Sequence, residues 1–312
     1  MQILTTPDGA TAHLADYPFA PHHVEVPTGD GGTLRVHLVD EGPRDAPPVV
    51  FLHGNPSWSY IWRSAIAAVT DAGYRAIAPD LVGMGLSDKP SELGDYTVAR
   101  HVEWMRAALF DELDLRDITF VLHDWGGIIG LRLLALEPDR VARVAISNTG
   151  LPERDPAKPL PEGPIEASGP FAGFQKFARE APAWEPWTLL EGTMVTPVRD
   201  EVRAGYHAPY PDQALTIGSR AFTQLLPTRP DNPMLADNWE AWKVLERFER
   251  PFLTIYSDRD VVAPTGYRQL IERIPGAAGQ PHVVLEGGGH FLQEDIPEAY
   301  DAALLTWLGT PG

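Results

Sequence analysis

The stretch Val121-Leu122-His123-Asp124-Trp125-Gly126-Gly127 decides the fold of this chain. The apolar and β-branched run Ile118–His123 predicts a buried strand, and the helical pattern Trp125–Leu136 begins directly after it. Asp124 therefore lies on a sharp strand-to-helix turn, followed by small residues. Such a turn is typical of a nucleophile elbow, which raises the side chain of its central residue above a sheet. An aspartate that only caps the following helix is the alternative interpretation.

Short β-rich runs alternate with longer helical patterns on both sides of this turn. The alternation predicts an α/β fold with a mainly parallel, eight-stranded sheet and helices on both faces. The turn-rich tetrad Gly29–Gly32 suits an antiparallel hairpin between the first two strands. The predicted strands are His23–Thr28, Leu34–Asp40, Val49–His53, Ala76–Pro79, Ile118–His123, Val144–Ser147, Phe252–Ser257 and Val283–Glu286, and the predicted helices are Trp58–Ala72, Thr97–Leu113, Trp125–Leu136, Thr265–Ile274 and Glu298–Leu308.

The segment Pro152–Pro233 differs from the rest of the chain. It is dense in proline and tryptophan and contains no clear strand pattern. Because proline removes a hydrogen-bond donor from a sheet, we expect a linker followed by a helical insertion that lies over the sheet. The sequence thus predicts one core, residues 1–151 and 231–312, and a helical cap, residues 152–230.

Composition excludes several classes of protein. The 312 residues include no cysteine, which excludes disulfides, thiolate metal sites and a cysteine nucleophile. The net charge of −18 argues against a nucleic-acid partner. The histidines lack metal-ligand spacing with carboxylates, so we expect no metal. No apolar run is long enough to span a membrane, and the N-terminus lacks a basic region before an apolar stretch, so we expect a cytoplasmic enzyme without a signal peptide.

Two further loops after predicted strands carry residues suited to catalysis. His290 follows the glycine run Gly287–Gly289, and Asp258 and Asp260 follow the strand Phe252–Ser257. Taken alone, such a histidine is more often structural and such an aspartate more often a turn residue. Together with the elbow, however, they give the order nucleophile, acid, base, which is the chain order of α/β-hydrolase triads. We choose Asp260 as the acid because it stands three residues after the strand end, with Asp258 as the alternative.

The loop Leu52-His53-Gly54-Asn55-Pro56-Ser57-Trp58 follows a predicted central strand. A glycine-containing loop at this position can aim backbone N–H groups at the same site. We therefore predict an oxyanion hole formed by the backbone N–H groups of Asn55 and Trp125.

Four motifs of the chain are His53–Tyr60, Asp80–Pro90, His123–Gly127 and His290–Asp295. They resemble those of haloalkane dehalogenases, a family with the α/β-hydrolase fold. The resemblance runs nearly the full length from Tyr17 and is weakest between residues 152 and 200. The elbow alone is shared with epoxide hydrolases, whereas the combination of Asn55 and Trp125 is more specific. The resemblance implies hydrolysis of a neutral haloalkane to an alcohol, a halide ion and a proton, without a cofactor.

The residue types fit this chemistry. A serine that attacked an alkyl halide would leave a stable ether, whereas the carboxylate of Asp124 leaves an ester that water can cleave. His290 would deprotonate that water, with Asp260 fixing the tautomer of the imidazole. The leaving halide needs groups that only donate a hydrogen bond, such as the indole of Trp125 and the amide of Asn55.

The second halide donor has an alternative. In one branch of the family it is a tryptophan of the cap, and in others it is the asparagine of the His-Gly-Asn-Pro loop. A loose alignment places Phe174 where the cap tryptophan would stand, and Trp184 and Trp187 follow it. We expect Asn55 to be the donor and keep Trp184 and Trp187 as the alternative.

Three rival functions use parts of the same pattern. An epoxide hydrolase would need two acidic cap hydroxyls, for which Tyr206 and Tyr210 are poor candidates because their segment is bounded by prolines. A haloacid dehalogenase would need an arginine where Trp125 stands. A non-catalytic binding protein of this fold has no need of a complete triad. The expected partners are thus a small neutral halogenated alkane and water, with halide as product, in a monomer or small homo-oligomer.

Overall fold

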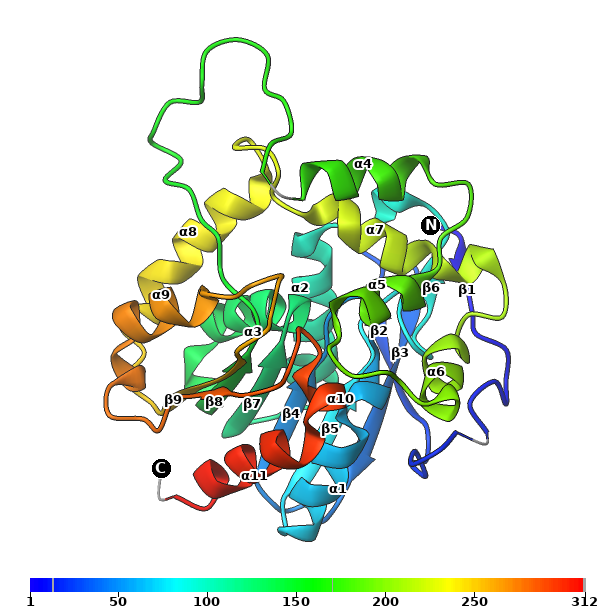
Figure 1. Ribbon diagram of the computed structural model, residues 1–312, viewed down its shortest axis with the longest axis vertical. Coiled ribbons are helices and arrows are strands. Elements are labelled where there is room, and N and C mark those ends of the chain that lie inside the picture. The colour runs from blue at the N-terminus through cyan, green and yellow to red at the C-terminus, as the bar shows by residue number, and fades with distance from the viewer. Residues whose placement is uncertain (13, 170, 311–312) are drawn as a thin grey trace.

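A central sheet of eight strands organises the computed structural model, which describes residues 1–12, 14–169 and 171–310 (Figure 1). Its strands are β2 (His22–Pro27), β3 (Thr33–Glu41), β4 (Pro48–Leu52), β5 (Arg75–Pro79), β7 (Ile118–His123), β8 (Val141–Ser147), β9 (Phe252–Ser257) and β10 (Val283–Leu285). The spatial order is β10-β9-β8-β7-β4-β5-β3-β2. The six strands from β10 to β5 pair in parallel, while β3 is antiparallel to both β5 and β2. The predicted fold class and the hairpin at Gly29–Gly32 are confirmed.

The predicted strands are all present, with small differences at their ends. The largest difference is in β8, which begins at Val141 rather than at Val144. The charged residue Arg143 interrupts the apolar pattern at the start of this strand. In the structure its guanidinium leaves the sheet and lies over the ring of Trp307. A two-stranded antiparallel sheet, β1 (Ile3–Leu4) with β6 (Lys89–Pro90), was not predicted. Strands of two residues are too short to show a periodic pattern.

Helices cover both faces of the sheet and bury one apolar cluster on each side (Figure 1). On one face lie α1 (Arg63–Asp71) and α11 (Pro297–Leu308), and on the other lie α2 (Val98–Arg106), α3 (Trp125–Leu136), α8 (Pro233–Leu245) and α9 (Gly266–Arg273). The helix α8 was missed, although Asn232 as N-cap and Pro233 at the first position are a known start signal. Among the described residues, no helix has both the length and the apolar character needed to cross a bilayer.

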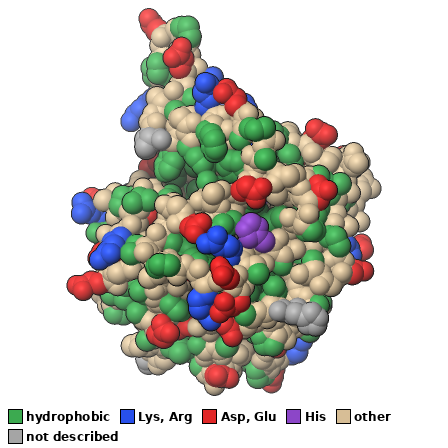
Figure 2. Space-filling view, turned by 45° about the vertical axis from the view of Figure 1, so that its right-hand side comes forward, with side chains coloured by type: hydrophobic (Ala, Val, Ile, Leu, Met, Phe, Trp, Pro, Cys, Tyr) green, Lys and Arg blue, Asp and Glu red, His purple; other side chains and the backbone are tan. Residues whose placement is uncertain are grey.

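Between β8 and α8 the chain leaves the sheet and forms a separate helical layer. Residues 152–169 extend away from the body and make the narrow projection at the top of Figure 2. They are followed by α4 (Ala172–Glu180), α5 (Pro186–Thr193), α6 (Asp200–His207) and α7 (Ile217–Leu225). No strand is present in the described part of this insertion. Side chains from α4, α5 and α7 face the end of β7, where Asp124 lies.

Candidate active site

Asp124 lies on the turn between β7 and α3 with backbone angles φ 50° and ψ −124°. A positive φ in a residue with a side chain costs about 1–3 kcal/mol and persists only where the surroundings enforce it. Here the turn packs tightly against its neighbours. A Cβ on Gly126 would collide with the carbonyl of Leu52, and one on Gly127 would collide with the side chain of Thr149. The carboxylate makes no capping hydrogen bond to α3. The turn therefore has the geometry of a nucleophile elbow.

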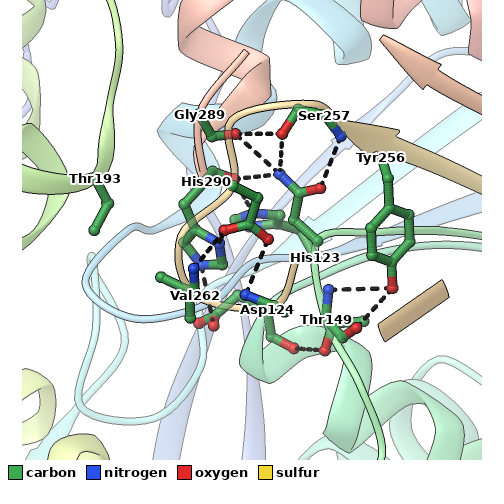
Figure 3. Close-up of polar contacts among 12 residues, drawn as sticks. His123, Asp124, Thr149, Thr193, Tyr256, Ser257, Val262, Gly289 and His290 are labelled. Carbon is green, nitrogen blue, oxygen red and sulfur yellow. Dashed lines mark hydrogen bonds and ion pairs between the residues drawn. The ribbon is translucent and has the colours of Figure 1, made fainter. Parts of the chain in front are cut away.

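His290 lies between two carboxylates. Its Nδ1 is 3.0 Å from Oδ1 of Asp260, and its Nε2 is 3.3 Å from Oδ2 of Asp124 (Figure 3). The alternative acid Asp258 is exposed and accepts a hydrogen bond from the backbone N–H of Gly287 at 2.8 Å. The structure thus brings the three predicted residues together, and of the two candidate acids only Asp260 contacts the imidazole.

The two carboxylates control the protonation of His290. Burial alone would lower its pKa, but hydrogen bonds and charge from Asp124 and Asp260 raise the pKa of His290 to about 9. Burial likewise opposes ionisation of Asp124, yet the hydrogen bond from His290 holds the pKa of that carboxyl below its ordinary value. The pKa of Asp260 is also lowered despite burial, by His290 and by the N–H groups of Val262 and Ala263. The two carboxylates therefore favour the protonated form of His290 in the free site.

The loop after β4 presents a backbone donor to the nucleophile. The N–H of Asn55 donates to Oδ1 of Asp124 at 2.9 Å. Gly54 is required beside it, because a Cβ there would collide with the carboxylate of Asp124. The ring of His53 accepts the N–H of Leu81 at Nε2, so its Nδ1 carries the proton and donates to the carbonyl of Gly54 at 2.9 Å. This bond fixes the peptide plane whose N–H faces Asp124.

A cavity of about 270 Å³ opens beside the triad, and its wall is mainly apolar. The indole of Trp125 and the amide of Asn55 are part of this wall. Within the described part of the chain, neither side-chain N–H group donates to a protein acceptor. The remaining wall residues from the core are Pro56, Val261, Val262 and Phe291, and those from the insertion are Phe171, Phe174, Leu189, Thr193, Thr223 and Leu226.

The tryptophans of the insertion lie elsewhere. The indole N–H of Trp184 donates to Oγ of Ser219 at 3.1 Å, and that of Trp187 to Oε2 of Glu191 at 3.1 Å. Neither side chain lines the cavity, whereas Phe174, which has no donor, does. Among the described residues, the side-chain N–H groups that line the cavity thus all belong to the core: Asn55 in the loop after β4, Trp125 at the start of α3 and His290 after β10.

Comparisons with known proteins agree with the fold described above. Residues 47–297 match the model of the alpha/beta hydrolase fold family. The chain is 46% identical to a haloalkane dehalogenase of Psychrobacter cryohalolentis over 99% of this chain and 98% of that protein. This chain belongs to the haloalkane dehalogenase family. It is also 45% identical to haloalkane dehalogenase 1 of Mycobacterium tuberculosis, over 98% of this chain and 99% of that one. Among solved structures, the tetrameric haloalkane dehalogenase DpaA of Paraglaciecola agarilytica superposes with a TM-score of 0.87 at 26% identity, covering 100% of this chain and 99% of that one.

One buried residue of this family member was missed in the sequence. Asn148 follows β8, and its amide donates to Oγ of Ser257 and to the carbonyls of Gly289 and His290 at 2.8–3.0 Å. Burial lowers the pKa of His123 to about 4, so its neutral ring donates from Nε2 to the same His290 carbonyl at 2.9 Å. Together they hold the loop that carries the base. A polar residue directly after a predicted strand was the available signal for Asn148.

Proposed function

We propose that this chain is a hydrolase of carbon–halogen bonds that converts small neutral halogenated alkanes and water into an alcohol, a halide ion and a proton. One observation carries the proposal. The Asp124 carboxylate stands on an elbow, 3.3 Å from His290, in the wall of an apolar cavity that also contains two unpartnered N–H donors among the described residues. An apolar cavity with few polar groups suits a neutral alkyl halide.

In the first step the carboxylate of Asp124 displaces the halide. A carboxylate oxygen attacks the saturated carbon, the new C–O bond forms as the carbon–halogen bond breaks, and the bonding electron pair leaves with the halide. The indole of Trp125 and the amide of Asn55 donate to the departing anion. The assignment of Asn55 over Trp184 or Trp187 is supported by the hydrogen bonds that already engage both cap indoles.

In the second step water cleaves the ester on Asp124. Esterification removes one of the two negative charges that raise the pKa of His290, so the imidazole can then lose its proton and act as a base. It takes a proton from water as the oxygen attacks the ester carbonyl, and Asp260 stabilises the imidazolium. The backbone N–H groups of Asn55 and Trp125 stabilise the oxyanion. Collapse releases the alcohol and restores the carboxylate.

Residues 152–230 form, in this proposal, a cap that supplies the apolar side of the cavity. The reaction needs no cofactor and no metal, since the carboxylate, the imidazole and water account for every bond made and broken. We also propose a cytoplasmic enzyme that works as a monomer or small homo-oligomer. The tetrameric state of DpaA supports the latter.

The rival epoxide hydrolase finds little support. The hydroxyl of Tyr206 donates to Oε1 of Glu294 at 2.5 Å, and that of Tyr210 accepts the N–H of Gly85 at 3.2 Å. Neither hydroxyl lines the cavity at Asp124. Two donors to an opening epoxide are thus missing from the cavity wall in the described residues.

The test incubates the purified protein with 1,2-dibromoethane and with 1-bromobutane, and follows bromide and proton release. Equal release of both ions is the expected result. Absence of bromide, together with turnover of styrene oxide, would overturn the proposal in favour of an epoxide hydrolase.

A further inference from the structure

The carboxylate of Asp295 joins the helical insertion to the loop that carries His290. Its Oδ1 accepts the backbone N–H of Thr196 at 2.7 Å, the hydroxyl of Thr196 at 2.6 Å and the backbone N–H of Val195 at 3.0 Å. Its Oδ2 accepts the N–H of Gly289 at 2.8 Å. Asp295 ends the short helix α10 (Leu292–Asp295), which follows the base in the chain. One side chain therefore holds together two segments that lie 100 residues apart in the sequence.

A second contact joins the same two segments at the base itself. The carbonyl of Thr193, the last residue of α5, accepts the backbone N–H of His290 at 2.9 Å, and Figure 3 shows Thr193 beside His290. The approach is close enough to require a glycine before the base, because a Cβ on Gly289 would lie 2.5 Å from the carbonyl oxygen of Thr193. The same helix lines the cavity with Leu189 and Thr193. The insertion thus contacts both the substrate space and the backbone of the base.

The backbone of His290 is therefore held from two sides. Its carbonyl is fixed by the core through Asn148 and His123, and its N–H is fixed by the insertion through Thr193. We propose that Asp295 is a positioning residue for the hydrolytic half of the reaction, because it seats residues 193–196 against the loop and so sets the angle of the His290 ring. This inference rests on the proposed function.

The two half-reactions depend on that angle to different degrees. Displacement of halide by Asp124 needs no proton transfer and depends on the ring only through the 3.3 Å contact between Nε2 and the carboxylate, so we expect a small shift of the ring to change it little. Ester hydrolysis needs Nε2 of His290 within hydrogen-bond reach of the attacking water, and a displacement of about 1 Å can slow such a step by about 10²-fold. A misplaced His290 ring should therefore lower the rate of ester hydrolysis and leave the rate of halide displacement nearly unchanged.

The substitution Asp295→Asn tests this with little change of shape. An amide has one acceptor oxygen, and its NH₂ group cannot accept from the N–H groups that face it. Either the N–H of Gly289 or that of Thr196 then loses its acceptor, whereas the N–H of Val195, which lies 3.0 and 3.1 Å from the two oxygens, keeps one. We expect hydrolysis of the alkyl-enzyme to slow about 10- to 100-fold and alkylation to change by less than about threefold. Thr196→Val, which removes only the hydroxyl donor, should cause a smaller change in the same direction.

The experiment is a rapid-quench time course with 1,2-dibromoethane, read out as bromide and as the mass of the intact protein. The expected result for Asp295→Asn is a burst of bromide, accumulation of the ester mass, and a parallel fall of kcat and KM, because a late step has become limiting. The matched control is Asp301→Asn. Its carboxylate accepts the hydroxyl of Ser64 at 2.5 Å in an exposed contact between α11 and α1, so its burst should match that of the unmodified protein.

The outcomes separate the inference from the proposed function. If Asp295→Asn slows both half-reactions by one common factor, or slows neither, the inference is wrong. If circular dichroism shows that this variant does not fold, the test uses Thr196→Val instead. An unchanged ratio of the alkylation rate to the ester-hydrolysis rate in Thr196→Val would then overturn the inference. If the unmodified protein releases no bromide at all, the proposed function fails instead.

Discussion

Replacement of Asn55 by leucine separates two roles that we propose for one residue. The side-chain amide lies in the cavity wall and would donate to the halide, whereas the backbone N–H donates to Asp124 at 2.9 Å and survives the substitution. Leucine has the same number and branching of side-chain heavy atoms as asparagine but no polar group. A hydrogen bond to a charged acceptor contributes about 1.5–3 kcal/mol, which corresponds to about 10- to 150-fold in affinity or rate.

Quenching of tryptophan fluorescence by bromide measures halide affinity, and rapid-quench kinetics measure alkylation and ester hydrolysis separately. In Asn55→Leu we expect halide affinity and alkylation to fall by that range, with hydrolysis changed by less than about threefold because the backbone donor of the oxyanion hole remains. Trp184→Phe is the matched control, since its indole N–H donates to Ser219 and lies outside the cavity wall. Loss of halide affinity in Trp184→Phe, with none in Asn55→Leu, would refute the assignment.

Three further predictions concern the triad. In His290→Ala the second step lacks its base, so an alkyl adduct should persist on Asp124 and be visible in the intact mass; unmodified protein after prolonged incubation would contradict a covalent intermediate. Asp260→Asn should slow turnover by about 10²- to 10⁴-fold because the imidazole loses its charged partner. Asp258→Asn should retain most of the turnover, because its amide oxygen can still accept the N–H of Gly287 and it does not contact the imidazole. The reverse order would make Asp258 the acid. The pKa of His290 is raised from 6.5 to about 9 in the folded protein, so its contribution to stability is complete below about pH 6.5 and is lost as the pH rises through about 9. The Tm should fall more steeply across that window than in His290→Gln, and equal slopes would show that the ion pairs do not stabilise the fold.

The triad could be found in the sequence because its signal is local. Asp124, Asp260 and His290 each follow a strand end in a chain of alternating strands and helices. The carboxyl ends of parallel strands share one edge of a sheet, so residues far apart in the sequence meet there without any further information. The sequence alone leaves Asp258 as an alternative to Asp260, because two residues in one loop differ only in the direction of their side chains.

Residues that act through the insertion gave no such signal. Asp295 contacts Val195 and Thr196 only because of how the insertion sits on the core, and no local pattern encodes that placement. Asn148 stands directly after a strand, but an amide carries no acid–base chemistry, so the sequence pattern did not indicate a role for it in the site. The small sheet β1–β6 likewise pairs segments that are distant in the sequence, and beside it the buried amino group of Lys89 donates to the hydroxyl of Thr6 at 2.8 Å.

The two half-reactions thus rely on different parts of the molecule. The groups proposed for displacement, namely Asp124, Trp125 and Asn55, all follow the buried core strands β4 and β7, which fix them independently of the insertion. The base is anchored on one side to α5, whose Thr193 both accepts the N–H of His290 and lines the cavity. A substitution in α5 that reshapes the cavity for another substrate therefore also moves the anchor of the base. Substrate choice and hydrolysis should change together in such variants, whereas substitutions in α4 or α7, which line the cavity without contacting the His290 backbone, should alter substrate choice alone.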